Sequence, residues 1–239
     1  MKACRLTWLG VAGLITLHTY LVAEEGDFII CLRTTYTTSA RIYLLPQSSS
    51  EIFYDNYSSL SGIMSYGGEI RYHIPSTIVE LGIGTEYLSI TQNGRFSILT
   101  GNQVYLVPTE EKFSMIPIEL SAYIVLPFGG PRFHITMGGG TGFYLGNRIW
   151  HMADIDAPVE KTPFGFGIHV QTGIDYILTK NLAFRGEIKF RDPQFEVTNR
   201  SDRMIVHYQG KNLPLEQTEF FSRINVDGIA FTIGIAYYF

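Results

Sequence analysis

Charged residues are scarce in this chain. Of its 239 residues only 17% are Asp, Glu, Lys or Arg, against the roughly 25% that soluble domains usually carry. The formal net charge is −4 and no run of Lys and Arg occurs, so we expect no nucleic-acid partner. Intrinsic disorder is excluded as well, because it requires low hydrophobicity and this chain is 46% hydrophobic.

Cysteine and long apolar runs are also lacking. The two cysteines, Cys4 and Cys31, are too few for a disulfide scaffold. No uninterrupted apolar run of about 18 residues occurs, which excludes a bundle of membrane-spanning helices. What remains is a chain that is 14% aromatic and contains 24 glycines. This composition is typical of all-β proteins and leaves two architectures open, a soluble sandwich and a membrane barrel.

The first 23 residues have the layout of a secretory signal peptide. Lys2 and Arg5 give a positive start, an apolar stretch follows, and the segment ends at Ala23. The apolar stretch is too short to cross a bilayer as a helix; the alternative is a buried first helix. We expect residues 1–23 to direct export and residues 24–239 to form an outer-membrane β-barrel domain, for the reasons that follow.

Beyond the signal, apolar and polar residues alternate with a period of two, which is the period of a β-strand. In 182–190, bulky apolar residues occupy one face while Ala183, Arg185, Glu187 and Lys189 occupy the other. Eight segments show this alternation, an even number. They are 27–44, 62–74, 77–91, 113–127, 132–146, 164–176, 182–190 and 228–239.

The connections between these segments differ in length. Three are tight turns, built from Pro, Gly, Ser, Thr, Lys and Asn at 75–76, 129–131 and 179–181. The other four are long and polar, with turn signals such as Asn93-Gly94 and Gly101-Asn102. Tight turns at one end and long loops at the other are typical of a transmembrane β-barrel. The long loops are expected near 45–61, 92–112, 147–162 and 192–222.

The size of the residues decides which face is outside. One face is uniformly bulky, while the other is rich in Gly and Ala with a few long polar side chains. An eight-stranded barrel has an interior only just wide enough for side chains, so the small and polar face lies inside. The sequence therefore predicts an all-β fold, a transmembrane antiparallel eight-stranded up-and-down β-barrel.

The last segment carries a more specific signal. It ends with Thr232, Gly234, Tyr237 and the final residue Phe239 on a correctly alternating strand. This ending resembles the C-terminal β-signal of bacterial outer-membrane proteins, and the mature chain resembles the small eight-stranded barrels of the outer-membrane protein A and W type. The resemblance implies a place in the cell outer membrane of a Gram-negative bacterium, contact with its lipid, and recognition of these four residues by the barrel assembly machinery.

The polar face places charged and imidazole side chains in the lumen. An ion path or gated pore is one interpretation. We favour the other, a plug of salt bridges and hydrogen bonds, because charges in a narrow interior must pair. The expected lumen network is Arg33, Glu69, Arg71, Glu80, Glu86, Glu119, His134, His169, Asp175, Arg185, Glu187 and Lys189, with His73 beside it.

No catalytic, cofactor-binding or metal site stands out, so we expect no enzyme and no cofactor. His151, Asp154 and Asp156 suggest a metal or an acid/base pair, but loop residues of this kind are usually solvated. A lipid-modifying enzyme would need a His and an acid beside the lipid-facing hydroxyl groups, and none is found there. Those hydroxyl groups belong to Thr85, Ser89, Thr141 and Thr172.

Three functions stay open at this point. The favoured one is a structural or surface-interaction role through long extracellular loops. If the protein has an extracellular ligand, these loops would bind it. The alternative, which the resemblance to the W type suggests, is a narrow channel for small or apolar solutes. A lipid-modifying enzyme is the least favoured. The sequence does not fix the oligomeric state.

Overall fold

The computed structural model describes residues 27–43, 57–160 and 164–239, and the expected signal peptide lies outside them. No helix among the described residues is long and apolar enough to cross a membrane. The elements are β1 Phe28–Tyr43, β2 Tyr57–His73, β3 Val79–Thr100, β4 Gln103–Leu126, the 3-10 turn η2 Gly130–Arg132, β5 Phe133–Met152, β6 Ile155–Ala157, β7 Phe164–Ile177, β8 Leu182–Arg191, β9 Gln194–Arg200, β10 Ile205–Tyr208, β11 Lys211–Pro214, β12 Glu219–Asn225 and β13 Ile229–Tyr238.

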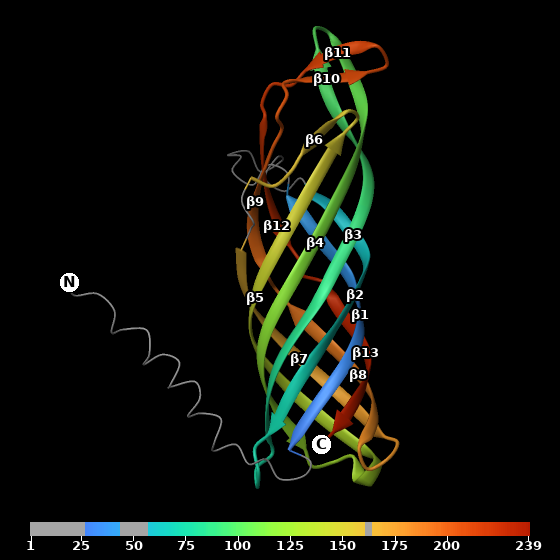
Figure 1. Ribbon diagram of the computed structural model, residues 1–239, viewed down its shortest axis with the longest axis vertical. Coiled ribbons are helices and arrows are strands. Elements are labelled where there is room, and N and C mark those ends of the chain that lie inside the picture. The colour runs from blue at the N-terminus through green and yellow to red at the C-terminus, as the bar shows by residue number, and fades with distance from the viewer. Residues whose placement is uncertain (1–26, 44–56, 161–163) are drawn as a thin grey trace, which may run out of the picture.

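Eight of these strands close into a ring. Neighbours pair in the order β1, β2, β3, β4, β5, β7, β8, β13, every pair is antiparallel, and β13 pairs back with β1. The result is a tall cylinder of tilted strands (Figure 1). The predicted eight-stranded antiparallel barrel is confirmed.

The two ends of the barrel differ as expected. The connections after β2, β4 and β7 are short, and the strand pairs that they join continue directly into the turns. The first and last strands meet at this same end, where the Phe239 backbone N–H donates to the Phe28 carbonyl at 2.9 Å, and the C-terminus lies there in Figure 1. We call this end the tight-turn end.

At the opposite end the strands are longer than predicted. β3 has 22 residues and β4 has 24, and they stay paired up to Thr100 and Gln103. The expected loop at 92–112 is therefore wrong: it is a continuation of the two strands into a projecting hairpin. At about 3.3 Å per residue, such strands far exceed the roughly 25 Å apolar band of an outer-membrane barrel.

The expected loop at 192–222 is also largely structured. It contains β9, the β10–β11 hairpin and β12. β9 and β12 pair with each other, and β12 pairs with the upper part of β1. On the other side, β9 meets β7 at Gln194 and bridges Val159 through Asn199. The wall of the barrel thus continues above the break at Pro193, a residue that has no N–H to donate to a ladder.

Burial alternates in the opposite sense to a soluble protein. On β7, Ile168 and Val170 are 66% and 57% exposed, whereas His169 between them is 2% exposed. The same inversion holds around the ring, where Ile, Leu, Phe and Tyr face outward and Gly, Ala and charged residues face inward. An apolar exterior and a polar interior are the arrangement of a membrane barrel, so the predicted assignment of the faces is confirmed.

Candidate functional site

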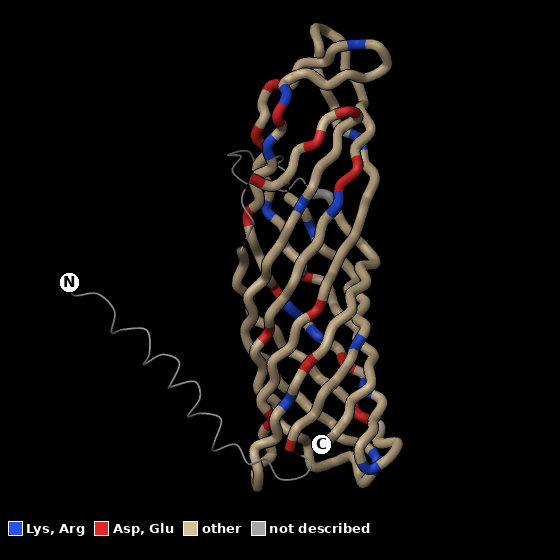
Figure 2. Tube along the Cα trace, viewed as in Figure 1, with Lys and Arg blue, Asp and Glu red and all other residues tan. Residues whose placement is uncertain are grey.

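Because side chains alternate between the two faces of each strand, the predicted lumen residues lie together inside the barrel. Eleven of the twelve are buried, and only His134, near the tight-turn end, is half-buried. They project inward from β1, β2, β3, β4, β5, β7 and β8. Figure 2 shows acidic and basic positions mixed along the cylinder rather than separated by sign. Acidic and basic side chains are therefore interspersed along the interior.

The centre of this network joins strands on opposite sides of the barrel. Arg71 donates to Glu69 through Nε at 2.9 Å and also donates to Glu187. Arg33 Nη1 lies 3.4 Å from one oxygen of each of these carboxylates. Tyr123 donates to Glu69 at 2.5 Å, and its ring lies beneath the Arg71 guanidinium, 3.8 Å from it. Four strands, β1, β2, β4 and β8, are linked by these contacts.

The lower part of the network is held by a pair on neighbouring strands. Arg185 of β8 donates two hydrogen bonds of 2.6 Å to Asp175 of β7. Tyr238 donates to the same carboxylate, and its hydroxyl lies 3.0 Å from Nδ1 of His134. Arg185 thus makes both of these bonds to the strand beside it, while Glu69 of β2 lies 3.6 Å away.

The upper part contains a residue that the sequence pattern did not supply. Lys189 Nζ lies 2.5 Å from Glu119, which also accepts a hydrogen bond from Tyr144 at 3.2 Å. Arg191 Nη1 lies 2.5 Å from Glu86. Arg191 follows the inward parity of β8, but the predicted segment ended at residue 190. One more residue of alternation would have revealed it.

A serine and a histidine meet at the same level. The Ser121 hydroxyl lies 2.8 Å from Nε2 of His169, and both residues are buried. Nδ1 of His169 has no hydrogen-bond partner in the described part of the chain, so no third group found there orients the ring as a serine nucleophile would require. The pair fits the packing of the lumen.

Above the charge network the interior becomes apolar. Twelve buried residues from most of the strands form one cluster there, among them Ile63, Leu88, Phe113, Met115 and Phe195. The rings of Phe113 and Phe195 are stacked with centroids 6.0 Å apart. Water-filled passage through the barrel would have to cross this layer as well as the charges.

A second polar group lies beyond the apolar layer, above the exposed apolar belt. Arg148 donates to Glu111, to Ser222 at 2.5 Å and to Asn199 at 3.2 Å. Burial lowers the pKa of Arg148, and the Glu111 carboxylate opposes that shift. Asn199 also donates to the carbonyls of Arg148 and Ala157. These bonds tie β9 and β12 to β4 and β5 and hold the upper wall closed.

A cavity of about 700 Å³ opens at the long-strand end. Its aromatic wall consists of Phe96, Trp150 and Phe220, whose rings meet edge to face with centroids 4.9 to 6.1 Å apart. Polar atoms in its lining come from Arg95, Glu111, Arg148 and Ser222. The cavity is thus mostly apolar and lies above the two layers that fill the barrel.

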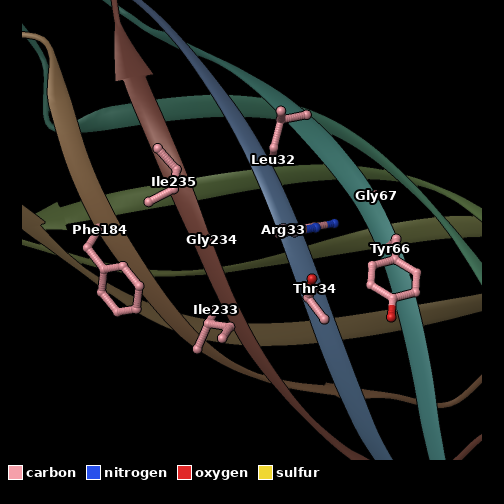
Figure 3. Close-up of a pocket in the computed structure, with 9 residues that line it drawn as sticks. All are labelled: Leu32, Arg33, Thr34, Tyr66, Gly67, Phe184, Ile233, Gly234 and Ile235. Carbon is pink, nitrogen blue, oxygen red and sulfur yellow. The ribbon is translucent and has the colours of Figure 1, made fainter.

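A shallower depression of about 440 Å³ lies on the outer wall. Figure 3 shows the side chains of Leu32, Tyr66, Phe184 and Ile233 around it, with the small Thr34 between them. The strands that carry them are β1, β2, β8 and β13. Because these residues belong to the exposed apolar surface, the depression is part of the membrane-facing wall.

The hydroxyl groups of the outward-facing threonines donate hydrogen bonds to the backbone of the neighbouring strand. Thr85 donates to the Pro117 carbonyl at 2.8 Å. Thr141 donates to the carbonyl of Gly167, and Thr172 donates to that of Thr136, each at 3.2 Å. Hydroxyl groups bonded to the neighbouring strand can face lipid at little cost. Each threonine is engaged with backbone, as expected for wall residues.

The acidic and histidine residues at 151–156 do not converge. His151 pairs with Asp156 at 2.5 Å, across the turn between β5 and β6. Asp154 instead accepts from Arg203 at 3.1 Å and from the His207 backbone N–H at 2.8 Å. Within the described part of the chain no three His, Cys, Asp or Glu residues are grouped so that they could hold a metal.

Three residues of the C-terminal motif lie on β13, on both of its faces, and the fourth, Phe239, directly follows the strand. The Thr232 hydroxyl contacts that of Thr35 at 2.8 Å inside the barrel. Gly234 packs closely against β1, because a Cβ there would lie 2.6 Å from the Leu32 carbonyl. Tyr237 and Phe239 are exposed, with ring centroids 4.8 Å apart. The motif therefore closes the ring and presents two aromatic rings outward; recognition by an assembly machinery stays a prediction.

A closed ring of eight antiparallel strands with an apolar exterior defines a transmembrane β-barrel.

No family model and no curated protein matches the sequence. Solved structures are similar over most of their length. OprG from Pseudomonas aeruginosa matches with 16% identity and a TM-score of 0.49, over 90% of this chain and 97% of that one. Ail of Yersinia pestis matches with 9% identity and a TM-score of 0.44, over 90% of this chain and 100% of that one. The protease OmpT from Escherichia coli matches with 10% identity and a TM-score of 0.48, over 92% of this chain and 100% of that one. At these values the likeness concerns the fold alone.

Proposed function

We propose that this chain is a barrel of the bacterial outer membrane, exported by residues 1–23. Closed antiparallel barrels with short turns at one end and long strands at the other are the form that outer-membrane proteins take. In this orientation the tight-turn end faces the periplasm, and the projecting β3–β4 hairpin lies outside the cell. The C-terminal motif would serve assembly of the barrel.

Within that membrane the chain has a structural or surface-interaction role and is not an enzyme. The observation that carries this proposal is the filled lumen. Arg71 and Arg185 are each 1% exposed, and the apolar cluster lies above them. A barrel whose interior is filled by its own side chains offers its environment only the outer wall and the extracellular extension.

The extension offers an apolar face to a partner. Leu99, Val104 and Leu106 are 56%, 63% and 51% exposed, and they share one face of the β3–β4 hairpin because Leu99 pairs with Val104 and Ser97 pairs with Leu106. They lie beyond the apolar belt, on the part of the hairpin that projects into water. Grouped apolar side chains in such a place mark interaction surfaces.

The test is adhesion by bacterial cells that display the protein. Replacing Leu99, Val104 and Leu106 together by Ser should reduce adhesion to a cell monolayer and self-aggregation, while the heat-modifiable mobility of the folded barrel stays unchanged. The matched control is Ser97→Ala on the same face, which should leave both unchanged. Equal adhesion and aggregation by the wild type and the triple variant would refute the surface role.

A second function is favoured by the aromatic cavity at the long-strand end. It would bind a small apolar solute without passing it on, because the apolar cluster and the charges lie beneath. Trp150 is the only tryptophan outside the expected signal, so its fluorescence reports on the cavity wall. Saturable quenching by naphthalene that is weakened in Phe220→Ala would support binding, and linear quenching unaffected by that substitution would exclude it.

A further inference from the structure

Glu80 differs from the other carboxylates of the network. Its side chain is fully buried, yet neither of its oxygens accepts a hydrogen bond from any residue that the structure describes. Arg71 Nη1 is 3.7 Å away and lies 3.5 Å from the Thr136 hydroxyl, whereas Nε and Nη2 of Arg71 donate to Glu69 and Glu187. Two imidazoles approach one oxygen, His134 Nε2 at 3.3 Å and His73 Nδ1 at 3.8 Å. An ionised carboxylate in this position lacks the donors that burial demands.

Hydrogen-bond chemistry fixes one proton of the neighbouring His134. Asp175 receives two charge-assisted bonds from Arg185, so it is ionised and can only accept. Tyr238 has one hydroxyl proton and donates it to Asp175. The Tyr238 oxygen must then act as the acceptor for Nδ1 of His134, 3.0 Å away. Nδ1 of His134 therefore carries a hydrogen.

The other ring nitrogen of His134 then faces Glu80. If the ring is neutral and Glu80 is ionised, two lone pairs oppose each other across 3.3 Å. One additional proton, on either atom, converts this repulsion into a hydrogen bond.

The charge of the network independently calls for one more proton. Six acids, Glu69, Glu80, Glu86, Glu119, Asp175 and Glu187, are buried with five bases, Arg33, Arg71, Arg185, Lys189 and Arg191. Each of the other five acids is hydrogen-bonded to an Arg or Lys of the set. The uncompensated charge falls on Glu80.

We propose that Glu80 and His134 hold one proton between them and that this proton closes a clasp across the tight-turn end. The clasp is the chain of contacts from Glu80 of β3 to His134 of β5, Tyr238 of β13, Asp175 of β7 and Arg185 of β8. It joins five strands of the ring at the tight-turn end. Loss of the proton breaks the link between Glu80 and His134, so that the clasp no longer includes β3, which stays in the wall through its backbone pairing with β2 and β4.

The other ionisable groups at this end do not compete for the proton shared by Glu80 and His134, because they have partners of their own or lie farther from Glu80. Asp175 and Arg185 satisfy each other, and Arg71 is bonded to Glu69 and Glu187. His73 of β2 is farther from Glu80 and is the more exposed of the two imidazoles, 32% against 20%. Asp27, just before β1, is buried and has a partner of its own.

The first test reads the proton directly in the refolded full-length barrel. Nitrogen NMR of the His134 ring and carbon NMR of the Glu80 carboxyl at neutral pH should show Nδ1–H together with either an imidazolium or a carboxylic acid. In Glu80→Gln, the amide N–H can donate to a bare Nε2, so His134 should be neutral with its hydrogen on Nδ1. A wild type with neutral His134 carrying its hydrogen on Nε2, beside an ionised Glu80, would overturn the proposal.

The second test measures what the proton does. The folded pair binds a proton that the unfolded chain has lost above its histidine pKa of about 6.5. The contribution of the pair to stability is therefore fully present between about pH 4.3, the pKa of an unfolded Glu, and about pH 6.5, and it decreases as the pH rises further. One proton corresponds to about a tenfold decrease in the folding equilibrium constant per pH unit, measured by urea unfolding in lipid vesicles.

Three variants separate the pair from its surroundings. Glu80→Gln should abolish the decrease above neutral pH, while His207→Gln on the β10–β11 hairpin and His73→Gln should keep it. A decrease that persists in Glu80→Gln, or that disappears in His73→Gln, would overturn the assignment to Glu80 and His134.

Discussion

Lys189 reaches across the lumen to Glu119. The first lies on β8 and the second on β4, two strands separated in the ring by β5 and β7, and the ammonium nitrogen is 2.5 Å from a carboxylate oxygen. Both side chains are 3% exposed. The pair therefore ties opposite walls together inside a medium where neither charge can be hydrated, and each charge depends on the other.

Removing one member of this pair should cost more than removing both. Lys189→Met leaves the Glu119 charge buried with Arg191 at 3.8 Å as its nearest remaining cation, and such losses cost about 3–5 kcal/mol. In Lys189→Met combined with Glu119→Gln, part of that loss should be recovered. Urea unfolding in lipid vesicles gives the four free energies of the cycle. Additive losses would show that the two residues do not interact.

The two faces of β8 should differ in how well they tolerate polar substitution. Ile188 is exposed on the apolar wall and Ala183 is buried in the lumen. Ile188→Arg should destabilise the inserted barrel by about 2–4 kcal/mol if it lies near the midplane of the bilayer. Ala183→Ser should have a much smaller effect. The heat-modifiable fraction on gels and the unfolding free energy measure both, and equal tolerance would contradict the assignment of the faces.

Two glycines should differ sharply when a methyl group is added. A Cβ at Gly140 would lie 1.8 Å from the Leu120 carbonyl of β4, whereas the nearest atom to a Cβ at Gly186 is a methyl carbon of Ile174 at 3.9 Å. Gly140→Ala should force β4 and β5 apart and cost at least about 1–3 kcal/mol. Gly186→Ala should fold like the wild type. Similar folding yields for both variants would show that the strands do not approach this closely.

The ring and its faces could be predicted because period two repeats on every strand. Once the bulky face is assigned to lipid, the inward position of residues such as Glu69 and Lys189 follows from counting. The ends of the strands could not be predicted in this way. Asn93-Gly94 is typical of a turn, yet Gly94 pairs with Thr109 within the ladder, and the chain turns at Gly101 with a φ of +62°. Phe96 packs against Trp150 and Phe220, and this tertiary contact favours continued pairing of β3 with β4 beyond the turn signal at Asn93-Gly94.

Partners within the lumen depend on register and side-chain length, which alternation does not contain. Asp175 and Arg185 are direct neighbours in the register of β7 and β8, so Arg185 bonds sideways. Lys189 on the same strand instead crosses to Glu119, while the residue opposite it on β7, Gln171, bonds to Tyr123. Alternation in the sequence therefore places most charged residues of the network in the lumen, although it missed Arg191, whereas the pairing between them requires the structure.

The central claim, a lumen closed by paired charges and an apolar layer, is tested most directly by single-channel recording in planar lipid bilayers. The wild type should show no steady conductance, and Arg185→Ala, which leaves Asp175 buried without its two 2.6 Å bonds, should admit water and produce small, fluctuating currents. A wild type that conducts steadily, with a conductance unchanged by Arg185→Ala, would contradict the closed lumen and favour a channel.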